Sequence, residues 1–285
     1  SIDSILTQSY SEFRFLIVDD ASTDDTREII RSYNDARIDL ICLESNMGQT
    51  AALNVGLKRV NTPWFARMDA DDFSAPSRLE EQMGALEADP SLSCLGTWAW
   101  IFREYPNVYE GELTPPKDLP DIRHRLLSTT PILHGSIIAK TEALLDVGAY
   151  DERYRYAADI ELWDRLLVKY TAANLPKKLM GIRYHEGQGQ RTVRALGEII
   201  AIQSRRLASG RYSPEESSII SSNLSRQHMV LARRLGGQGR FIQLLKSLTR
   251  ALRLSPKTSV WLFLAIFIGY TMPERYRNRV REILS

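Results

Sequence analysis

The sequence predicts an α/β fold in which a mostly parallel sheet is flanked by helices and followed by a helical extension. Between Phe13 and Pro90, short apolar runs rich in strand formers alternate with helical patterns. This alternation is typical of strand–helix–strand units with crossover helices. Carboxylates cluster where two of these runs end, and from Thr192 onward the pattern is helical throughout. We therefore expect a domain over residues 1–191 and a basic helical extension over 192–285.

The first part of the chain gives the clearest alternation. We expect strands at 13–18, 38–43 and 64–68. Helices should follow each of them: one capped by Ser22 or Thr23 and running to 33, then 50–59, then 78–87. Asp24 and Asp25 suit the first turn of the first helix because their negative charges interact favourably with the positive end of its dipole.

After Pro90 the pattern becomes irregular. It predicts strands at 93–103, 133–139 and 179–184, and helices at 122–127, 141–147 and 159–169. Residues 1–6 form an amphipathic helical pattern with no strand before them. Because a doubly wound sheet normally opens with a strand, we expect the first strand of the fold to be missing from this chain.

Composition places the chain among ordinary globular proteins, with 44% hydrophobic and 25% charged residues. The net charge of +2 hides an asymmetry, because residues 192–285 hold 16 Lys and Arg against 5 Asp and Glu. The acidic first part could hold a cation, and the basic extension could meet an anionic surface. Cys42 and Cys94 lie in strand-like runs, which predicts buried, reduced thiols.

Three carboxylates, Asp69, Asp71 and Asp72, directly follow the third predicted strand. Carboxylates this close repel each other unless a cation or a shared proton joins them. A divalent metal with oxygen ligands, Mg²⁺ or Mn²⁺, would meet that need while holding phosphates. The alternative is a solvated acidic turn or an Asp cap for the following helix.

Further polar residues stand at ends of predicted elements. Asp19 and Asp20 could accept hydrogen bonds from a base or from ribose hydroxyls, or they could simply cap a helix. Asp159, at the start of a helix, is either a cap or a general base that takes a proton from an incoming hydroxyl. His185 could complete a metal site as a neutral imidazole or be purely structural.

Together these elements resemble the family 2 glycosyltransferases, which have the nucleotide-diphospho-sugar transferase (GT-A, Rossmann-like) fold. The resemblance covers roughly residues 1–191. It depends on the order and spacing of several short motifs: Ser4-Ile5-Leu6-x-Gln8, Val18-Asp19-Asp20-x-Ser22-x-Asp24, Asn46-x-Gly48, Asn54-x-Gly56, Arg67-Met68-Asp69-Ala70-Asp71-Asp72, Pro76-x-Arg78-Leu79-x-x-Gln82, His134-Gly135-Ser136, Gly148-x-Tyr150-Asp151, Asp159-x-Glu161-Leu162-Trp163-x-Arg165-Leu166 and Arg183-x-His185.

The resemblance implies an inverting transfer of a sugar from a nucleotide-diphospho-sugar to an acceptor hydroxyl. It implies that Asp159 is the catalytic base. The implied donor-binding residues are Asp19, Asp20, Asn46, Gly48, Asn54, Arg67, Asp69, Ala70, Asp71 and His134. The implied ligands of Mn²⁺ or Mg²⁺ are Asp71, Asp72 and His185. One departure is Ala158, which stands where the family often has a second acid before the base.

The expected role is the synthesis of a bacterial-type surface polysaccharide on a glycan or lipid-linked acceptor, in the cytoplasm or at the inner face of the membrane. The alternative is a non-catalytic nucleotide-sugar-binding module of the same fold. Nucleic-acid binding is disfavoured because the basic residues fall on the helical extension, without strand aromatics to stack bases. The apolar run 260–268 and the arginines after it suit a membrane-surface contact. A buried helix is the competing interpretation of that run.

Overall fold

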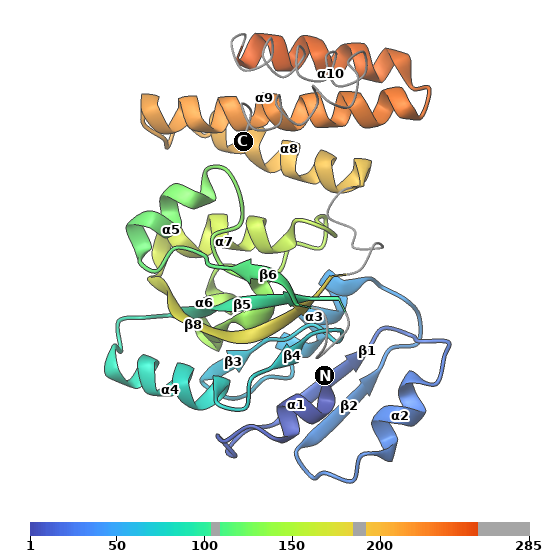
Figure 1. Cartoon of the computed structure of the whole chain (residues 1–285), viewed down its shortest axis with the longest axis vertical. Coiled ribbons are helices and arrows are strands. Elements are labelled where there is room, and N and C mark those ends of the chain that lie inside the picture. The colour runs from blue at the N-terminus through green and yellow to red at the C-terminus, as the bar shows by residue number, and fades with distance from the viewer. Residues whose placement is uncertain (104–108, 185–191, 256–285) are drawn as a thin grey trace. The chain divides into compact units, whose positions relative to one another are not determined.

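The computed structural model describes residues 1–103, 109–184 and 192–255 (Figure 1). The chain forms two compact units, Ser1–Gln188 and Gly189–Ser285. The predicted domain boundary, at 191/192, falls beside residues outside the described ranges and stays a prediction. The α/β class is confirmed in the first unit, where sheets are flanked by helices.

A parallel pair of strands opens the first unit after the short helix α1 (Ile2–Leu6). The element order is β1 (Phe15–Asp19), α2 (Thr26–Ser32), β2 (Ile38–Cys42) and α3 (Gln49–Leu57). β1 and β2 pair in register from Phe15 with Ile38 to Asp19 with Cys42, so their carboxyl ends lie side by side. Helix α3 packs closely on β1, because a Cβ at Gly56 would lie 3.2 Å from Cγ2 of Val18.

A second sheet forms the centre of the unit. Its strand order is β3 (Trp64–Ala66), β7 (Ile138–Lys140), β5 (Cys94–Phe102), β8 (Ala172–Arg183) and β4 (Phe73–Ser74), and β6 (Tyr109–Leu113) pairs with β5. Among the described strands of this sheet, only β5 and β8 run parallel. The expectation of a mostly parallel sheet is therefore wrong here. The strand–helix alternation stops at Pro90, and without regular crossover helices neighbouring strands can run antiparallel.

Helices cover this sheet and position its loops. They are α4 (Arg78–Ala88), α5 (Leu119–Leu126), α6 (Thr141–Asp146) and α7 (Ala158–Lys169), with a 3₁₀ turn η1 (His134–Ser136) before β7. Of the predicted strand at 133–139, only the end forms a strand, β7, because the 3₁₀ turn occupies the middle. The predicted cap at Ser22 or Thr23 is also wrong, since α2 begins at Thr26 after Asp25, and Asp24 accepts from the N–H of Thr26.

The last strand is longer than predicted. β8 begins at Ala172, although Pro176 lies in its path and proline lacks the N–H that a central strand donates. The pairing with β5 jumps from Thr97–Leu175 to Trp98–Lys178, so the proline falls in a bulge. The short strands β4 and β6 were not predicted at all.

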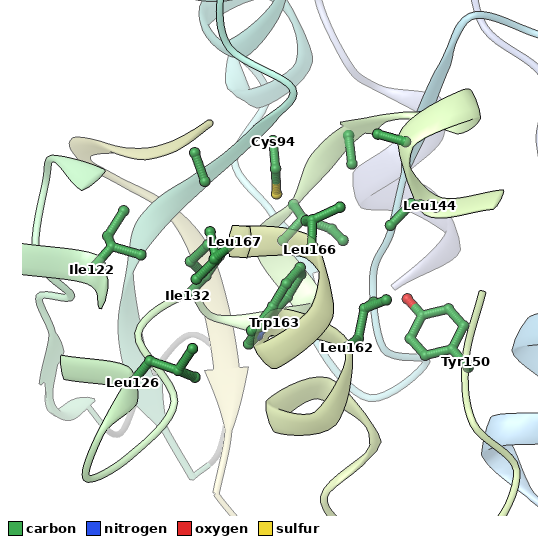
Figure 2. Close-up of a cluster of buried hydrophobic side chains, with 14 of the residues drawn as sticks. Cys94, Ile122, Leu126, Ile132, Leu144, Tyr150, Leu162, Trp163, Leu166 and Leu167 are labelled. Carbon is green, nitrogen blue, oxygen red and sulfur yellow. The ribbon is translucent and has the colours of Figure 1, made fainter. Parts of the chain in front are cut away.

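The main hydrophobic core of the first unit lies around Trp163 of α7 (Figure 2). Trp163 and Leu166 are fully buried among side chains from β5, α5 and α6. Cys94 belongs to this core, and burial raises the pKa of its thiol to about 12. Both cysteines are free, as predicted, but Cys42 is only half-buried. The core fixes α7, and with it the start of that helix, where Asp159 stands.

The second unit consists of helices in its described part, α8 (Val193–Ala208), α9 (Pro214–Gly237) and α10 (Phe241–Leu254). The predicted breaks at Gly210 and at 236–237 coincide with helix ends. α9 starts with a reciprocal capping box between Ser213 and Glu216. Ser225 of α9 donates to the carbonyl of Ala251 of α10, 3.1 Å away. In the part of the chain described, none of the helices is both long and apolar enough to cross a bilayer.

Candidate active site

The predicted carboxylate cluster lies in the loop between β3 and β4. Arg67 opens this loop. The residue is 5% exposed, and its guanidinium forms a bidentate ion pair with Asp69. Asp69 also accepts a hydrogen bond from Nε2 of Gln49, 3.0 Å away. Such bidentate pairing fixes both side chains in one orientation. The first carboxylate of the cluster is therefore neutralised by the protein itself.

Asp72 is different, because it is 5% exposed and has no arginine paired with it in the described contacts. Its Oδ1 accepts the backbone N–H of Arg183 at 2.9 Å, and Nε of Arg183 donates to the carbonyl of Asp71 at 3.1 Å. Burial, together with repulsion from Asp69 and Asp71, raises the pKa of Asp72 to about 7. The ionised form of Asp72 is therefore disfavoured in this site.

The His134-Gly135-Ser136 turn lies against the same carboxylates. A Cβ on Gly135 would lie 3.3 Å from Oδ2 of Asp72 and 3.4 Å from Oδ2 of Asp69. Nε2 of His134 lies 2.8 Å from the hydroxyl of Tyr150. Burial and the nearby charge of Arg67 hold the pKa of His134 well below its usual value, so the imidazole is neutral.

Arg78, at the start of α4, ties this turn to the carboxylate loop. It is 1% exposed, and its Nη1 donates to the carbonyls of Gly135 at 3.1 Å and Arg67 at 3.2 Å. Burial and the neighbouring Arg67 lower its pKa to about 10, which still leaves it charged at neutral pH. The Nε atoms of both arginines have no hydrogen-bond partner within the described residues.

Arg78 was part of a sequence motif but was not predicted as a site residue. A signal was present in the sequence. Arg78 is the first residue of its helix, where the positive end of the dipole disfavours a cation. An arginine at that position needs another interaction to compensate, and the structure supplies it through the two loop carbonyls.

Asp159 lies in the first turn of α7, as predicted, and is half-buried. Burial raises the pKa of its carboxyl, while the N–H of Ile160, the charge of Arg67 and the hydroxyl of Thr130 favour the ionised form. The same Arg67 that pairs with Asp69 thus acts electrostatically on Asp159. A carboxyl group whose pKa is raised holds a proton more readily than an ordinary aspartate, which suits the role of a general base.

The second acidic pair, Asp19 and Asp20, ends β1. Burial raises the pKa of Asp19, but hydrogen bonds from Ser22 and Arg27 outweigh it and leave that pKa lowered. Asp20 accepts the backbone N–H groups of Met47 at 2.7 Å and Gly48 at 2.8 Å.

The turn at 46–48 packs against this pair. Asn46 donates to the carbonyl of Asp20 at 3.0 Å. Gly48 has a φ of 89°, a backbone conformation that residues other than glycine rarely adopt. Gln49 directly follows this turn and donates a hydrogen bond to Asp69. One residue therefore links the Asp19–Asp20 pair to the carboxylate loop.

Asn54, predicted to contact the donor, has its amide engaged inside the protein. Its Nδ2 donates to the carbonyl of Tyr150 at 2.9 Å and to Glu152 at 2.8 Å, and its Oδ1 accepts from the N–H of Tyr150 at 3.0 Å. These bonds give Asn54 a positioning role between α3 and the loop before α7. A donor contact by Asn54, like the other donor contacts, stays a prediction.

The described residues contain no set of three or more His, Cys, Asp or Glu side chains arranged to hold a metal. His185, the predicted third ligand, lies outside the described residues. The carboxylates that are present do fit Mg²⁺ or Mn²⁺, because Asp71 and Asp72 offer hard oxygen atoms next to each other in one loop. Such ions are typically held by one or two carboxylates together with substrate phosphates.

The fold is of the GT-A type, with sheets flanked by helices. A family model for glycosyl transferase family 2 matches residues 1–148. The chain belongs to that family. Asp159 and all later residues lie beyond the matched segment.

Two curated relatives illustrate the similarity. The putative glycosyltransferase EpsE of Bacillus subtilis is 34% identical over 189 residues, which cover 64% of this chain and 66% of that protein. The amylovoran biosynthesis glycosyltransferase AmsE of Erwinia amylovora is 31% identical over 145 residues, covering 50% of this chain and 53% of that protein. The chain therefore spans less than two-thirds of these relatives.

Solved structures support the fold. S. aureus TarS 1-349 has a TM-score of 0.65 at 18% identity, over 99% of this chain and 85% of that one. The mannosyltransferase PcManGT from Pyrobaculum calidifontis, solved with GDP-Man and Mn²⁺, has a TM-score of 0.59 at 19% identity, over 98% of this chain and 78% of that one. At these identities the likeness concerns the fold.

Proposed function

We propose that this chain transfers a sugar from a nucleotide-diphospho-sugar to an acceptor hydroxyl, with inversion at the anomeric carbon. The observation that carries the proposal is the position of Arg67. It pairs with Asp69 in the carboxylate loop and acts electrostatically on Asp159. This position of Arg67 supports a proposal in which the donor phosphates and the base lie on either side of one buried cation.

In the proposed reaction, Asp159 takes the proton of the acceptor hydroxyl as its oxygen attacks the anomeric carbon. The new bond forms on the face opposite the bond to the diphosphate, which breaks, and its electron pair leaves with the nucleoside diphosphate. Proton transfer of this kind requires an ionised carboxylate. Arg67 and the N–H of Ile160 favour that form of Asp159.

The carboxylate loop would hold the donor diphosphate through a divalent cation. Asp71 and Asp72 are the described residues that would bind Mn²⁺ or Mg²⁺, and the ion would neutralise charge on the departing diphosphate. Gly135 leaves the space beside Asp72 free of a side chain. Asp20, through the 46–48 turn, would shape the pocket for the nucleoside.

The names of the relatives support a role in bacterial surface polysaccharide synthesis, because AmsE is named for amylovoran biosynthesis. We place the activity at the cytoplasmic side of the membrane, on a glycan or lipid-linked acceptor. Two neighbours, TarS with UDP and PcManGT with GDP-Man and Mn²⁺, suggest the donors to try first.

The test is release of nucleoside diphosphate from UDP- and GDP-sugars by the full chain, with Mn²⁺ and then with EDTA. An active transferase releases UDP or GDP with Mn²⁺, and EDTA abolishes the release. Asp71→Ala should reproduce the effect of EDTA. Asp121→Ala, which removes an exposed carboxylate in the first turn of α5, serves as the control. Nucleotide binding without release for any donor and acceptor would favour the non-catalytic binding module instead.

A further inference from the structure

The outer face of α10 in the second unit exposes apolar side chains that nothing described covers. Ile242 is 73% exposed, Leu245 61% and Leu252 47%. The opposite face of the helix is buried against α9, with Ser247 and Ala251 inside. Exposed apolar residues that share one helix face mark a surface for binding.

Basic residues lie beside this apolar strip. At about 3.6 residues per turn, positions 242, 245, 249 and 252 follow one line along the helix, and 246, 250 and 253 follow the next. A shallow groove of about 380 Å³ runs over both lines, lined by Ile242, Leu245, Lys246, Thr249, Arg250 and Arg253. We call these residues together with Leu252 the α10 face.

Acidic residues are missing from the surrounding sequence. Residues 217–273 contain no Asp or Glu, so the charges of the α10 face have no acidic neighbours along the chain. An amphipathic helix with apolar residues on one side and Lys and Arg next to them is typical of elements that lie in a membrane interface. The apolar side chains enter the boundary of the acyl chains, while the long basic side chains reach the phosphates.

Charge also argues against two other occupants. In a symmetric dimer the α10 face would meet itself, which would bring Lys246, Arg250 and Arg253 against their own copies. The final residues of the chain, 256–285, hold five Lys and Arg against two Asp and Glu. Covering the α10 face with that net positive segment would again place like charges together.

We propose that the α10 face binds an anionic lipid bilayer, with Ile242 and Leu245 inserted and Lys246, Arg250 and Arg253 at the headgroups. The apolar run at 260–268, for which the sequence suggested a membrane contact, lies outside the described residues and is not part of the α10 face. The proposal does not depend on the transfer reaction, because it concerns binding by the second unit alone.

The experiment is flotation of the full chain with vesicles of phosphatidylcholine alone or with about 30% phosphatidylglycerol, the anionic component that supplies the surface charge. We expect the wild type to float with the anionic vesicles only. Raising the salt from about 0.05 M to about 0.5 M should release it, because screening removes the attraction.

Two variants test the two halves of the α10 face. Ile242→Ser/Leu245→Ser removes the apolar part, and Lys246→Gln/Arg250→Gln/Arg253→Gln removes the charge. Each should weaken binding to anionic vesicles by at least about tenfold. The charge variant loses three basic residues, each of which contributes roughly a fivefold factor near an anionic surface. The serine variant loses the apolar area that would be buried in the bilayer. All substituted residues are exposed, so unchanged thermal melting should verify that both variants fold.

Matched controls come from the first unit. Ile29→Ser/Val168→Ser replaces two other exposed apolar side chains, 55% and 61% exposed. Arg31→Gln/Lys58→Gln/Arg59→Gln removes the same charge from other exposed positions. Wild-type flotation by both controls, with loss in both α10 variants, supports the proposal. It is overturned if the wild type does not float, if neutral vesicles bind equally well, or if the α10 variants float like the wild type.

Discussion

Asp72 accepts the backbone N–H of Arg183 at 2.9 Å, a bond that joins the carboxylate loop to the end of β8. The two residues are far apart in the chain, and neither position alone indicates the contact. The bond holds Asp72 in a buried place next to two other carboxylates. The bond itself favours the ionised carboxylate, but burial and the neighbouring carboxylates outweigh it and raise the pKa of Asp72 to about 7.

Replacing Asp72 by Asn should stabilise the metal-free protein, and more so at pH 8 than at pH 5. Because the folded-state pKa of Asp72 lies above its ordinary value of 3.8, the folded state prefers the protonated carboxyl. The free energy of unfolding therefore falls as the pH rises from about 4 to 7. Asn keeps the acceptor for Arg183 and removes this effect.

The difference is at most on the order of 4 kcal/mol above pH 7, since a change of one in pKa corresponds to about 1.4 kcal/mol. Thermal or urea unfolding in EDTA, at a series of pH values, measures it. Equal stabilisation at pH 5 and pH 8 would mean that Asp72 has an ordinary pKa. A gain in stability with a loss of activity is the pattern expected for a functional residue.

Gly135→Ala adds only one methyl group but should still impair nucleotide binding. The new Cβ would lie 3.3 Å from Oδ2 of Asp72 and 3.4 Å from Oδ2 of Asp69, so the carboxylates would have to move. We expect Mn²⁺-dependent nucleotide binding to weaken by at least about tenfold, because ligand geometry tolerates little displacement. Titration of the nucleotide with and without Mn²⁺ measures this.

Gly84→Ala is the matched control, because Gly84 lies inside α4 and an added Cβ would meet no atom within 4 Å beyond its chain neighbours and the backbone of its own helix. Alanine there should stabilise the helix by about 0.5–1 kcal/mol and leave binding unchanged. If Gly135→Ala bound the nucleotide as the wild type does, the close approach of this turn to the carboxylates would have no functional meaning.

Arg78→Met should destabilise the protein by about 2–4 kcal/mol. The change removes the donor to the carbonyls of Gly135 and Arg67, and an unsatisfied buried acceptor costs about 1–3 kcal/mol. Urea unfolding measures the loss. Arg59→Met, on an exposed arginine after α3, should change stability by less than about 0.5 kcal/mol. Equal effects of the two substitutions would contradict the role given to Arg78.

The first strands and helices could be predicted from the sequence because each is a short apolar run or a capped amphipathic segment. The order of the strands in the second sheet could not. β8 passes through Pro176 only because a bulge removes that residue from the ladder. The antiparallel pairing of β3 with β7 depends on a turn at His134–Ser136 whose sequence does not indicate its shape.

For the site, the residue types were sufficient to locate the carboxylates and Asp159, but not to distinguish their environments. Asp69, Asp71 and Asp72 look equivalent in sequence. In the structure Asp69 is paired with Arg67, whereas Asp72 is buried and has no such partner among the residues that the structure describes. The amide of Asn54 is engaged by Tyr150 and Glu152, contacts that the sequence did not indicate, and its predicted contact with the donor stays a prediction.

The most direct test of the central claim is the steady-state and binding analysis of Asp159→Asn. Asparagine keeps the size of the side chain and removes its basicity, so kcat should fall by at least about a hundredfold with the affinity for the donor nucleotide little changed. Asp151→Asn, in the loop before α7 and paired with Arg153, serves as the control and should stay within about threefold of the wild type. A kcat near the wild-type value for Asp159→Asn would contradict the assignment of Asp159 as the base.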